Sequence, residues 1–360
     1  MNILADENMP YIEQLLAPLN ANIQFKSGRN ITNDDLSKTD VLLVRSVTQV
    51  NSSLLKNTPV KFIGTATIGV DHIDLDYCQA QNIPVVSSPG CNADAVADYV
   101  ICALLQVIDD FSGQNIGVVG LGNVGTKVSQ RLKDLGANVV GYDPFLKEHD
   151  TTLTTLDDVL NQDIICCHAP KTMGGEFPTF HLLDENNINK IKSCSILLNA
   201  GRGEVIDQSA LLNRMQKQND LTLLMDVWEN EPHINIELMP FCKIATGHIA
   251  GYSQRGKVNG SQMVVEALFK FLDKMDLFKA LDVLEIKDIQ NQNLSLKQFC
   301  EKMYDIKQDD SNFRASQLHT DSHIRGVEFD QYRKTYPIRD EFIQYRSLDA
   351  SLIKAGMKHV

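Results

Sequence analysis

The stretch GVVGLGNVG, residues 117–125, decides the fold of this chain. It sets Gly120, Gly122 and Gly125 in a G-x-G-x-x-G pattern between an apolar strand-like run and an amphipathic helical run. In such a turn the first glycine permits the tight bend, and the second lets a pyrophosphate approach the backbone. The third lets the helix pack closely on the sheet. The stretch therefore predicts a dinucleotide-binding strand–turn–helix unit.

Two further features strengthen this prediction. The helix would begin at Asn123 and Val124, where free amide groups and the positive end of the helix dipole favour phosphates. Asp143 ends the next strand-like run, where a carboxylate accepts hydrogen bonds from the adenosine ribose. Because an acid there repels a 2′-phosphate, NAD is favoured over NADP. A glycine-rich turn that binds no ligand is the alternative interpretation.

Short apolar runs alternate with helical patterns on both sides of this motif, which indicates parallel sheets covered on both faces. We therefore expect an α/β fold with two parallel-sheet domains and a small C-terminal α+β module. A long helix expected over 257–282 would return the chain to the first domain. The expected domains are 1–91 with 257–284, then 92–256, then 285–360.

Composition narrows the class of protein. The chain has 360 residues, 43% hydrophobic and 22% charged, with a net charge of −12. A soluble globular protein is expected, and nucleic acid is an unfavourable partner for so acidic a chain. No apolar run reaches the length of a membrane span, and the N-terminus lacks the basic start of a signal peptide. The eight cysteines never form a C-x-x-C pair, so we expect a reducing, cytoplasmic location and no metal site. Cys91 is the thiol whose reactivity most needs testing.

Chemistry at a nicotinamide requires a base, a cation that polarises the substrate, and a carboxylate that tunes the base. Three residues follow successive predicted strands, where such groups belong in this fold. Arg202 lies in NAGRGEVID, Glu231 in DVWENEP and His248 in TGHIAGY. Each residue also has a structural interpretation. Arg202 could lie in a surface turn, Glu231 could be an exposed loop acid, and His248 could be a structural histidine. Their joint position favours the catalytic interpretation.

Asp226 ends the strand that precedes Glu231. It has two interpretations, a structural carboxylate or a hydrogen-bond acceptor for the nicotinamide carboxamide.

The chain resembles the NAD-dependent D-isomer-specific 2-hydroxyacid dehydrogenases. The matching stretches, in the family's order, are GTATIGVDHIDL, GLGNVG, NAGRGEVID, DVWENEP and GHIAGY, which span roughly residues 64–252. The resemblance implies two flavodoxin/Rossmann-like domains, a substrate-binding lid and an NAD-binding domain, with the active site in the cleft between them. It also implies that Arg202, Glu231 and His248 form the catalytic set.

Within this family the chain is most similar to a branch whose substrate is a small phosphorylated 2-hydroxy acid. MNILADENMP, LLVRSVTQVN and SPGCNADAVADYV are typical of it, and the tail FDQYRKTYPIRDEF is similar to its C-terminal dimerisation domain. The resemblance implies a homodimer. It places Ser46, Thr67 and Tyr252 on the substrate, and Gly251 and Asp226 on NAD. Where the branch often has a threonine beside the cofactor, this chain has Ala169, which preserves a backbone contact but not a hydroxyl contact.

The phosphate of such a substrate needs its own donors. Arg45 and Ser46, beside the end of a predicted strand, are the first candidates, and a tail arginine (Arg333, Arg339 or Arg346) is the second. Two alternatives stay open: another member of the family such as a 3-phosphoglycerate dehydrogenase, and a non-catalytic NAD-sensing binding protein.

Overall fold

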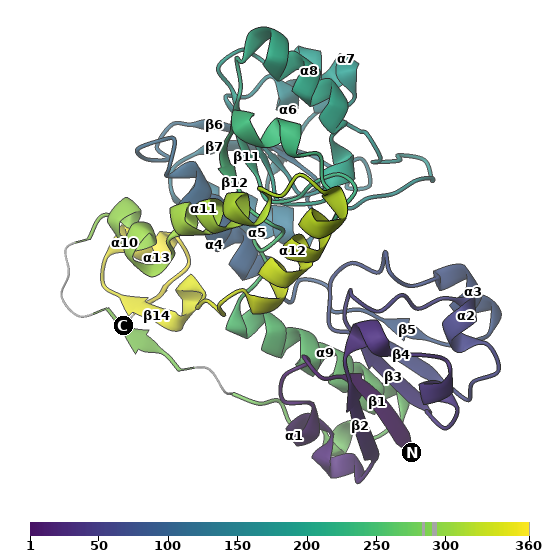
Figure 1. The fold of residues 1–360 in the computed structure, drawn as a ribbon. Coiled ribbons are helices and arrows are strands. Elements are labelled where there is room, and N and C mark those ends of the chain that lie inside the picture. The colour runs from purple at the N-terminus through teal and green to yellow at the C-terminus, as the bar shows by residue number, and fades with distance from the viewer. Residues whose placement is uncertain (283–284, 290–293, 360) are drawn as a thin grey trace. The chain divides into compact units, whose positions relative to one another are not determined.

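The computed structural model describes residues 1–282, 285–289 and 294–359 and forms two compact units (Figure 1). The first unit combines Met1–Asn92 with Ser253–Glu285, and the second combines Ala93–Tyr252 with Ile286–Val360. The contacts thus group the C-terminal region with the larger sheet domain. A separate C-terminal domain stays a prediction.

The first unit contains a five-stranded parallel sheet in the order β2-β1-β3-β4-β5, the flavodoxin-like arrangement. Every residue of β3 and β4 is buried, as expected for central strands covered on both faces. The strands are β1 (Asn2–Asp6), β2 (Asn22–Lys26), β3 (Val41–Val44), β4 (Phe62–Thr65) and β5 (Val85–Val86). The helices are α1 (Ile12–Leu16), α2 (Ser52–Leu55), α3 (Leu75–Ala80) and α9 (Gln254–Phe271).

Helix α9 does return to the first unit, but the expectation that it continues to residue 282 is wrong. It ends at Phe271 because Asp273 adopts a left-handed conformation (φ 54°). The amide of Lys274 then donates to the carbonyl of Phe269 at 2.9 Å, a helix-ending hydrogen bond. The apolar residues beyond it fold back instead of extending the helix, with the ring of Phe278 5.5 Å from that of Phe269.

The second unit contains a seven-stranded parallel sheet in the order β12-β11-β10-β9-β6-β7-β8. Its reversal of strand order lies between β6 and β9, where folds of this kind bind ligands beyond the carboxyl ends of the strands. The strands are β6 (Asn115–Val119), β7 (Asn138–Tyr142), β8 (Thr152–Leu153), β9 (Ile164–Cys167), β10 (Ile196–Asn199), β11 (Thr222–Met225) and β12 (Cys242–Ala245). The helices are α4 (Ala93–Leu104), α5 (Asn123–Asp134), α6 (Leu156–Leu160), α7 (Glu185–Lys190) and α8 (Gln208–Gln218).

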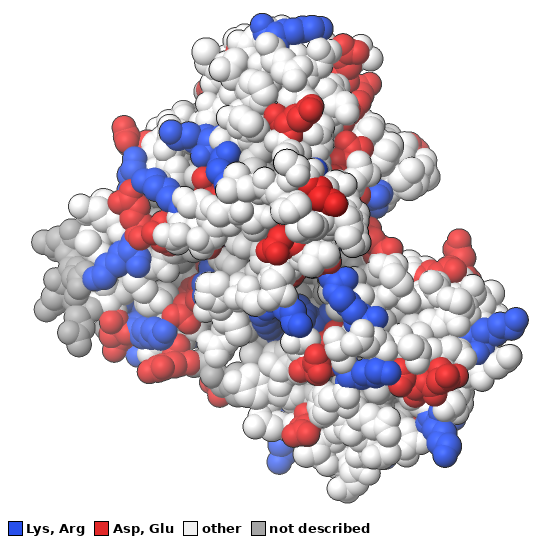
Figure 2. All heavy atoms as spheres, in the orientation of Figure 1, with Lys and Arg blue, Asp and Glu red and all other residues white. Residues whose placement is uncertain are grey.

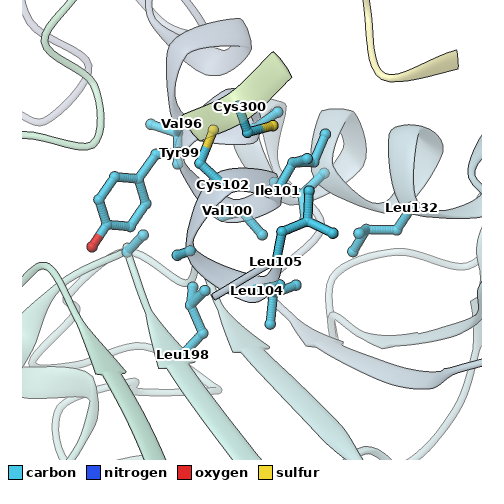
Figure 3. Close-up of a cluster of buried hydrophobic side chains, with 14 of the residues drawn as sticks. Val96, Tyr99, Val100, Ile101, Cys102, Leu104, Leu105, Leu132, Leu198 and Cys300 are labelled. Atoms are coloured by element: carbon cyan, nitrogen blue, oxygen red, sulfur yellow. The ribbon is translucent and has the colours of Figure 1, made fainter. Parts of the chain in front are cut away.

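Helix α4 forms the centre of the main core of this unit (Figure 3). Its residues from Ala95 to Leu104 are all buried, because one face packs on the sheet and the other is covered by α5 and the C-terminal region. Leu132 of α5 and Cys300 of the C-terminal region contact the same cluster. The C-terminal region is therefore part of the core of the second unit.

The C-terminal region is a small α+β structure, as predicted. It comprises a parallel sheet of β13 (Lys287–Asp288), β14 (Tyr345–Ser347) and β15 (Lys358–His359) with helices α10 (Leu296–Met303), α11 (Ile306–Ser316), α12 (Ser322–Thr335) and α13 (Ala350–Lys354). Helix α11 packs on β12, where the Asp310 carboxylate accepts a hydrogen bond from the amide of Ala245 at 2.7 Å.

Acidic and basic side chains are interspersed over the face seen in Figure 2. In the described ranges no helix combines the length and apolar character needed to cross a bilayer. None of the eight cysteines is in a disulfide, and Cys91 is buried.

Candidate active site

The glycine turn after β6 has the geometry that the sequence predicts. Gly120 has a φ of 84°, and a Cβ on Gly125 would lie 1.9 Å from the carbonyl oxygen of Gly120. Only glycine therefore allows α5 to begin so close to the strand. A Cβ on Gly122 would meet no described atom within 4 Å, and Gly122 and Asn123 are exposed. The turn leaves open space at the helix N-terminus, which fits a pyrophosphate.

Asp143 is fixed beside this turn. One carboxylate oxygen accepts a hydrogen bond from the amide of Leu121 at 3.0 Å, and the other accepts from the amide of Phe145 at 3.1 Å. The turn and the acid are thus held together by a direct contact. Each oxygen has a second lone pair available in principle to a ribose hydroxyl. The glycine turn and Asp143 therefore fit the pyrophosphate and the ribose of NAD, as the sequence predicts.

The segment after β9 closes the other side of the glycine turn. A Cβ on Gly120 would lie 2.7 Å from the backbone of Ala169, so the two backbones are in direct contact. The preceding residue, His168, is buried, and neither ring nitrogen has a hydrogen-bond partner in the described part of the chain. Burial lowers the pKa of His168 to about 4. Orphaned polar atoms at this strand end are consistent with a ligand-binding site.

The proposed catalytic pair forms in the structure. Nδ1 of His248 lies 2.7 Å from Oε2 of Glu231, and the other oxygen of Glu231 accepts a hydrogen bond from the amide of Trp228 at 2.9 Å. Burial raises the pKa of Glu231, but His248, Arg333 and the Trp228 amide outweigh burial, so its pKa is lowered and the group stays ionised. A carboxylate on Nδ1 leaves Nε2 of His248 as the nitrogen that can exchange a proton with a substrate.

Asp226 shapes the loop that carries His248. Its buried carboxylate accepts hydrogen bonds from the hydroxyl of Thr246 and the amides of Ile249 and Ala250, at 2.6–3.0 Å. The amide of His248 donates to the Asp226 carbonyl at 2.6 Å, and His248 adopts a φ of 58°. These hydrogen bonds confirm one of the two interpretations of Asp226 from the sequence, that of a structural carboxylate. The contact with nicotinamide stays a prediction.

Arg202 follows β10 and is half-buried. Its Nη1 donates to the carbonyl of Gly201 at 2.9 Å, and its own carbonyl accepts from the side chain of Asn199 at 3.0 Å. The next residue, Gly203, lies against the backbone of Trp228, where a Cβ would approach to 2.0 Å. The turn that presents Arg202 is therefore packed directly on the loop that presents Glu231.

Tyr252 ends the His248 loop beside Gly251, and both are half-buried. The tail arginines differ from one another in their surroundings. Arg333 of α12 stacks over the ring of Tyr252, with Cζ 5.5 Å from the ring centroid. Arg339 donates to the carbonyls of Ala95, Ile249 and Ala250, and Arg346 is exposed on β14. Of the three, Arg333 is the one beside a predicted substrate residue.

The remaining predicted substrate residues belong to the first unit. Arg45 and Ser46 directly follow β3, and Thr67 lies just after β4, all at the carboxyl edge of that sheet. The hydroxyl of Thr67 is 2.7 Å from that of Thr65 and donates to the carbonyl of Gly69 at 3.0 Å. Lys257 was not assigned a role from the sequence. Burial and the charge of Arg45 both lower its pKa, which places two cations near one another.

One cluster of the second unit escaped the sequence analysis. Nε2 of His181 lies 2.8 Å from Glu229, and its Nδ1 is 3.8 Å from Asp207. These three groups are close enough to hold a metal ion, although the His181–Glu229 contact is also a normal hydrogen bond. Their spacing in the sequence does not predict that they meet, because they come from three separate loops. The expectation that the protein uses no metal stays a prediction.

Comparison with known proteins agrees with this geometry. The NAD-binding domain of the D-isomer specific 2-hydroxyacid dehydrogenases matches residues 104–250, and a domain of unknown function matches residues 279–350. The erythronate-4-phosphate dehydrogenase of Psychromonas ingrahamii is 42% identical over 356 residues, 95% of this chain and 91% of that one. That of Tolumonas auensis is 42% identical over 377 residues, 99% of this chain and 98% of that one.

Solved structures share the fold. A D-lactate dehydrogenase of Aquifex aeolicus in complex with NAD and lactic acid has a TM-score of 0.65 at 24% identity, covering 77% of this chain and 97% of its own. An NAD-bound 3-phosphoglycerate dehydrogenase of Entamoeba histolytica has a TM-score of 0.67 at 21% identity, covering 78% and 99%. Residues 104–250 of the second unit thus form an NAD-binding domain, and the chain is an NAD-dependent dehydrogenase. It belongs to the erythronate-4-phosphate dehydrogenase family, within the D-isomer specific 2-hydroxyacid dehydrogenases.

Proposed function

We propose that this chain oxidises 4-phospho-D-erythronate at C2 with NAD. The product is (R)-3-hydroxy-2-oxo-4-phosphooxybutanoate, an intermediate in the biosynthesis of pyridoxine 5′-phosphate (vitamin B6). The observation that carries the proposal is the 2.7 Å contact between His248 and Glu231, beside the Arg202 turn, in a chain 42% identical to relatives of that name.

The residues that would hold NAD lie at the carboxyl edge of the second sheet. They are Gly120, Gly122, Asn123, Val124 and Gly125 for the pyrophosphate, Asp143 for the ribose, and Ala169, Asp226 and Gly251 towards the nicotinamide. When bound, NAD accepts the hydride that leaves C2 of the substrate.

His248 serves as the base. As the C2–H bond breaks, Nε2 of His248 takes the proton of the C2 hydroxyl, and the oxygen left behind becomes the carbonyl of the product. Glu231 holds the proton on Nδ1 and stabilises the imidazolium that forms. Their contact orients the ring towards the reacting hydroxyl.

Arg202 binds the substrate carboxylate and polarises the developing carbonyl. The planar guanidinium matches a carboxylate through two parallel N–H donors, a geometry that lysine cannot reproduce. The packing of its turn on Trp228 fixes Arg202 relative to Glu231, which favours one orientation of the substrate.

Arg45 and Ser46 bind the phosphate, and Thr67 and Tyr252 contact the rest of the substrate. The charge of Arg45 helps to lower the pKa of Lys257, after burial, and an anion bound close to both cations would be stabilised by each of them. This assignment gives each negative group of the substrate a cation.

A comparison of substrates tests the proposal. With NAD, kcat/KM for 4-phospho-D-erythronate should exceed that for 3-phosphoglycerate by at least about 100-fold, as expected for a site matched to one chain length and hydroxyl pattern. A clear preference for 3-phosphoglycerate would contradict the proposal. Binding of NAD without turnover of any 2-hydroxy acid would instead favour an NAD-sensing protein.

We also propose that the enzyme is a cytoplasmic homodimer joined through its C-terminal region. Large apolar side chains of this region are exposed, namely Leu318, Ile324, Val327, Ile338 and Leu348. Exposed apolar side chains mark an interface where they form one contiguous patch, and the proposed dimer requires this of these residues. Light scattering of the full chain should give twice the 40.2 kDa chain mass. A mass of one chain at micromolar concentration would exclude the dimer.

A further inference from the structure

Arg333 combines three properties that separate it from an ordinary surface arginine. Its Cζ stacks 5.5 Å from the ring centroid of Tyr252, the residue four positions after His248. It also lies 6.0 Å from the ring of Phe329 one turn earlier in α12. Its Nε atom is buried and has no hydrogen-bond partner within the described residues. The arginine is therefore held by aromatic packing, while part of its donor capacity is unused.

The position of Arg333 is fixed by the same contacts that fix the catalytic loop. Arg339 donates to the carbonyls of Ile249 and Ala250, which directly follow His248. The ring of Tyr336, one turn after Arg333, meets that of Tyr252 edge-on at 5.9 Å. The end of α12 is thus attached to the loop from two sides, so Arg333 belongs to the same packed unit as the proton-transfer histidine.

Arg333 stays positively charged and interacts electrostatically with Glu231, the carboxylate partner of His248. Burial opposes the charge of Arg333, but Tyr252, Glu231 and Asp330 outweigh burial and raise its pKa, so it remains a cation. Arg333 in turn helps to lower the pKa of Glu231. A permanent positive charge therefore lies close to the residues that handle the substrate.

We infer that Arg333 is a substrate-binding and specificity-determining residue that donates hydrogen bonds to the substrate's phosphate. This inference rests on the proposed function, because it requires a phosphorylated 2-hydroxy acid. Arg202 matches the carboxylate at one end of that molecule, and the phosphate at the other end carries close to two further charges near neutral pH. A planar guanidinium with an unused Nε–H is suited to bidentate contact with phosphate oxygens.

The inference gives the C-terminal region a part in catalysis. Arg333 lies within residues 279–350, which match the domain of unknown function. A phosphate group has enough oxygens for several donors, so Arg333 can bind it without being its sole partner.

The test compares two substrates that differ only in the phosphate, 4-phospho-D-erythronate and D-erythronate. The variants are Arg333→Met, Arg333→Lys and the control Lys334→Met, which removes an exposed cation from the next position of the same helix. For Arg333→Met we expect kcat/KM on 4-phospho-D-erythronate to fall about 10- to 100-fold, while kcat/KM on D-erythronate changes less than about threefold. Arg333→Lys should recover part of the loss, and Lys334→Met should resemble the wild type. The inhibition constant of inorganic phosphate should rise at least about tenfold in Arg333→Met.

Equal losses on both substrates would overturn the inference, because Arg333 would then act only through Tyr252 or Glu231. An unchanged preference for the phosphorylated substrate would overturn it as well. Measurements of NADH binding and circular dichroism serve as the control that Arg333→Met is folded. If the wild type fails to oxidise 4-phospho-D-erythronate, the proposed function fails first, and this inference fails with it.

Discussion

Nδ1 of His248 lies 2.7 Å from Oε2 of Glu231, and the backbone amide of Trp228 holds the other oxygen of that carboxylate at 2.9 Å. The carboxylate is thus oriented before any substrate arrives, and it determines which ring nitrogen can exchange protons. A histidine held in this way is a preorganised base.

Replacement of His248 by asparagine should remove the base and leave the cofactor site intact. We expect His248→Asn to lower kcat/KM for the 2-hydroxy acid by about 10²- to 10⁴-fold, the usual contribution of general base catalysis. Fluorescence titration should show NADH binding within about threefold of the wild type, because the glycine turn and Asp143 are unchanged. Parallel loss of turnover and NADH binding would identify His248 as a structural residue.

Glu231→Gln retains the size of the side chain but removes its charge. Without the carboxylate, the positive charge that forms on His248 during proton transfer loses its partner at 2.7 Å. We therefore expect kcat/KM for the 2-hydroxy acid to fall about 10- to 100-fold, while NADH binding stays within about threefold of the wild type. Steady-state kinetics and fluorescence titration measure the two quantities. An unchanged kcat/KM would show that Glu231 does not assist the histidine.

The sequence alone predicts those parts of this site that depend on local sequence patterns. Gly120 and Gly125 are glycines because the turn admits nothing larger, so the motif itself predicts the contact between strand and helix. Arg202, Glu231 and His248 follow neighbouring strands β10, β11 and β12, and the carboxyl ends of parallel strands share one edge. That rule predicts their proximity without any structure.

Other features depend on contacts that no periodicity encodes. Arg339 meets the carbonyls of Ile249 and Ala250 across about ninety residues of sequence, from a region without the alternation of strands and helices. The end of α9 at Phe271 depends on the left-handed conformation of Asp273, a residue type that is also common inside polar helix faces. Long-range packing and single backbone conformations thus limited the sequence prediction.

Asp143 should determine the choice between NAD and NADP. Asp143→Asn keeps a side-chain oxygen for the amide of Leu121 but removes the negative charge that repels a 2′-phosphate. The ratio of kcat/KM with NADP to that with NAD should rise at least about tenfold. The control Asp150→Asn, an exposed acid further along the same loop, should leave the ratio unchanged. A variant that loses both cofactors equally would show that Asp143 supports the turn and not the selection.

His168 should make the protein less stable in acid. Burial lowers its pKa to about 4 in the folded protein, against about 6.5 in an unfolded chain. Between pH 6.5 and pH 4 the unfolded state therefore binds more protons, and the free energy of unfolding falls as the pH falls. The loss approaches about 3 kcal/mol at the lower end of this window. Urea denaturation of the wild type and His168→Gln at pH 7.5 and pH 5 isolates the effect, since only the wild type carries this proton. An equal acid loss in both proteins would assign the effect to other groups.

Arg339 should position the catalytic loop from the C-terminal region. Its guanidinium donates to the carbonyls of Ala95, Ile249 and Ala250, and it stacks 4.4 Å from the ring centroid of Tyr304. Arg339→Gln cannot reach all three carbonyls, and buried carbonyls without partners cost on the order of 3 kcal/mol in total. We therefore expect the melting temperature to fall by about 5 °C or more and kcat to fall about tenfold, because the peptide after His248 loses its support.

The matched control is Arg346→Gln, which removes an exposed arginine of β14 and should change neither the melting temperature nor kcat. Loss of stability with unchanged kcat in the folded variant would confine Arg339 to a structural role and separate the C-terminal region from the chemistry of His248.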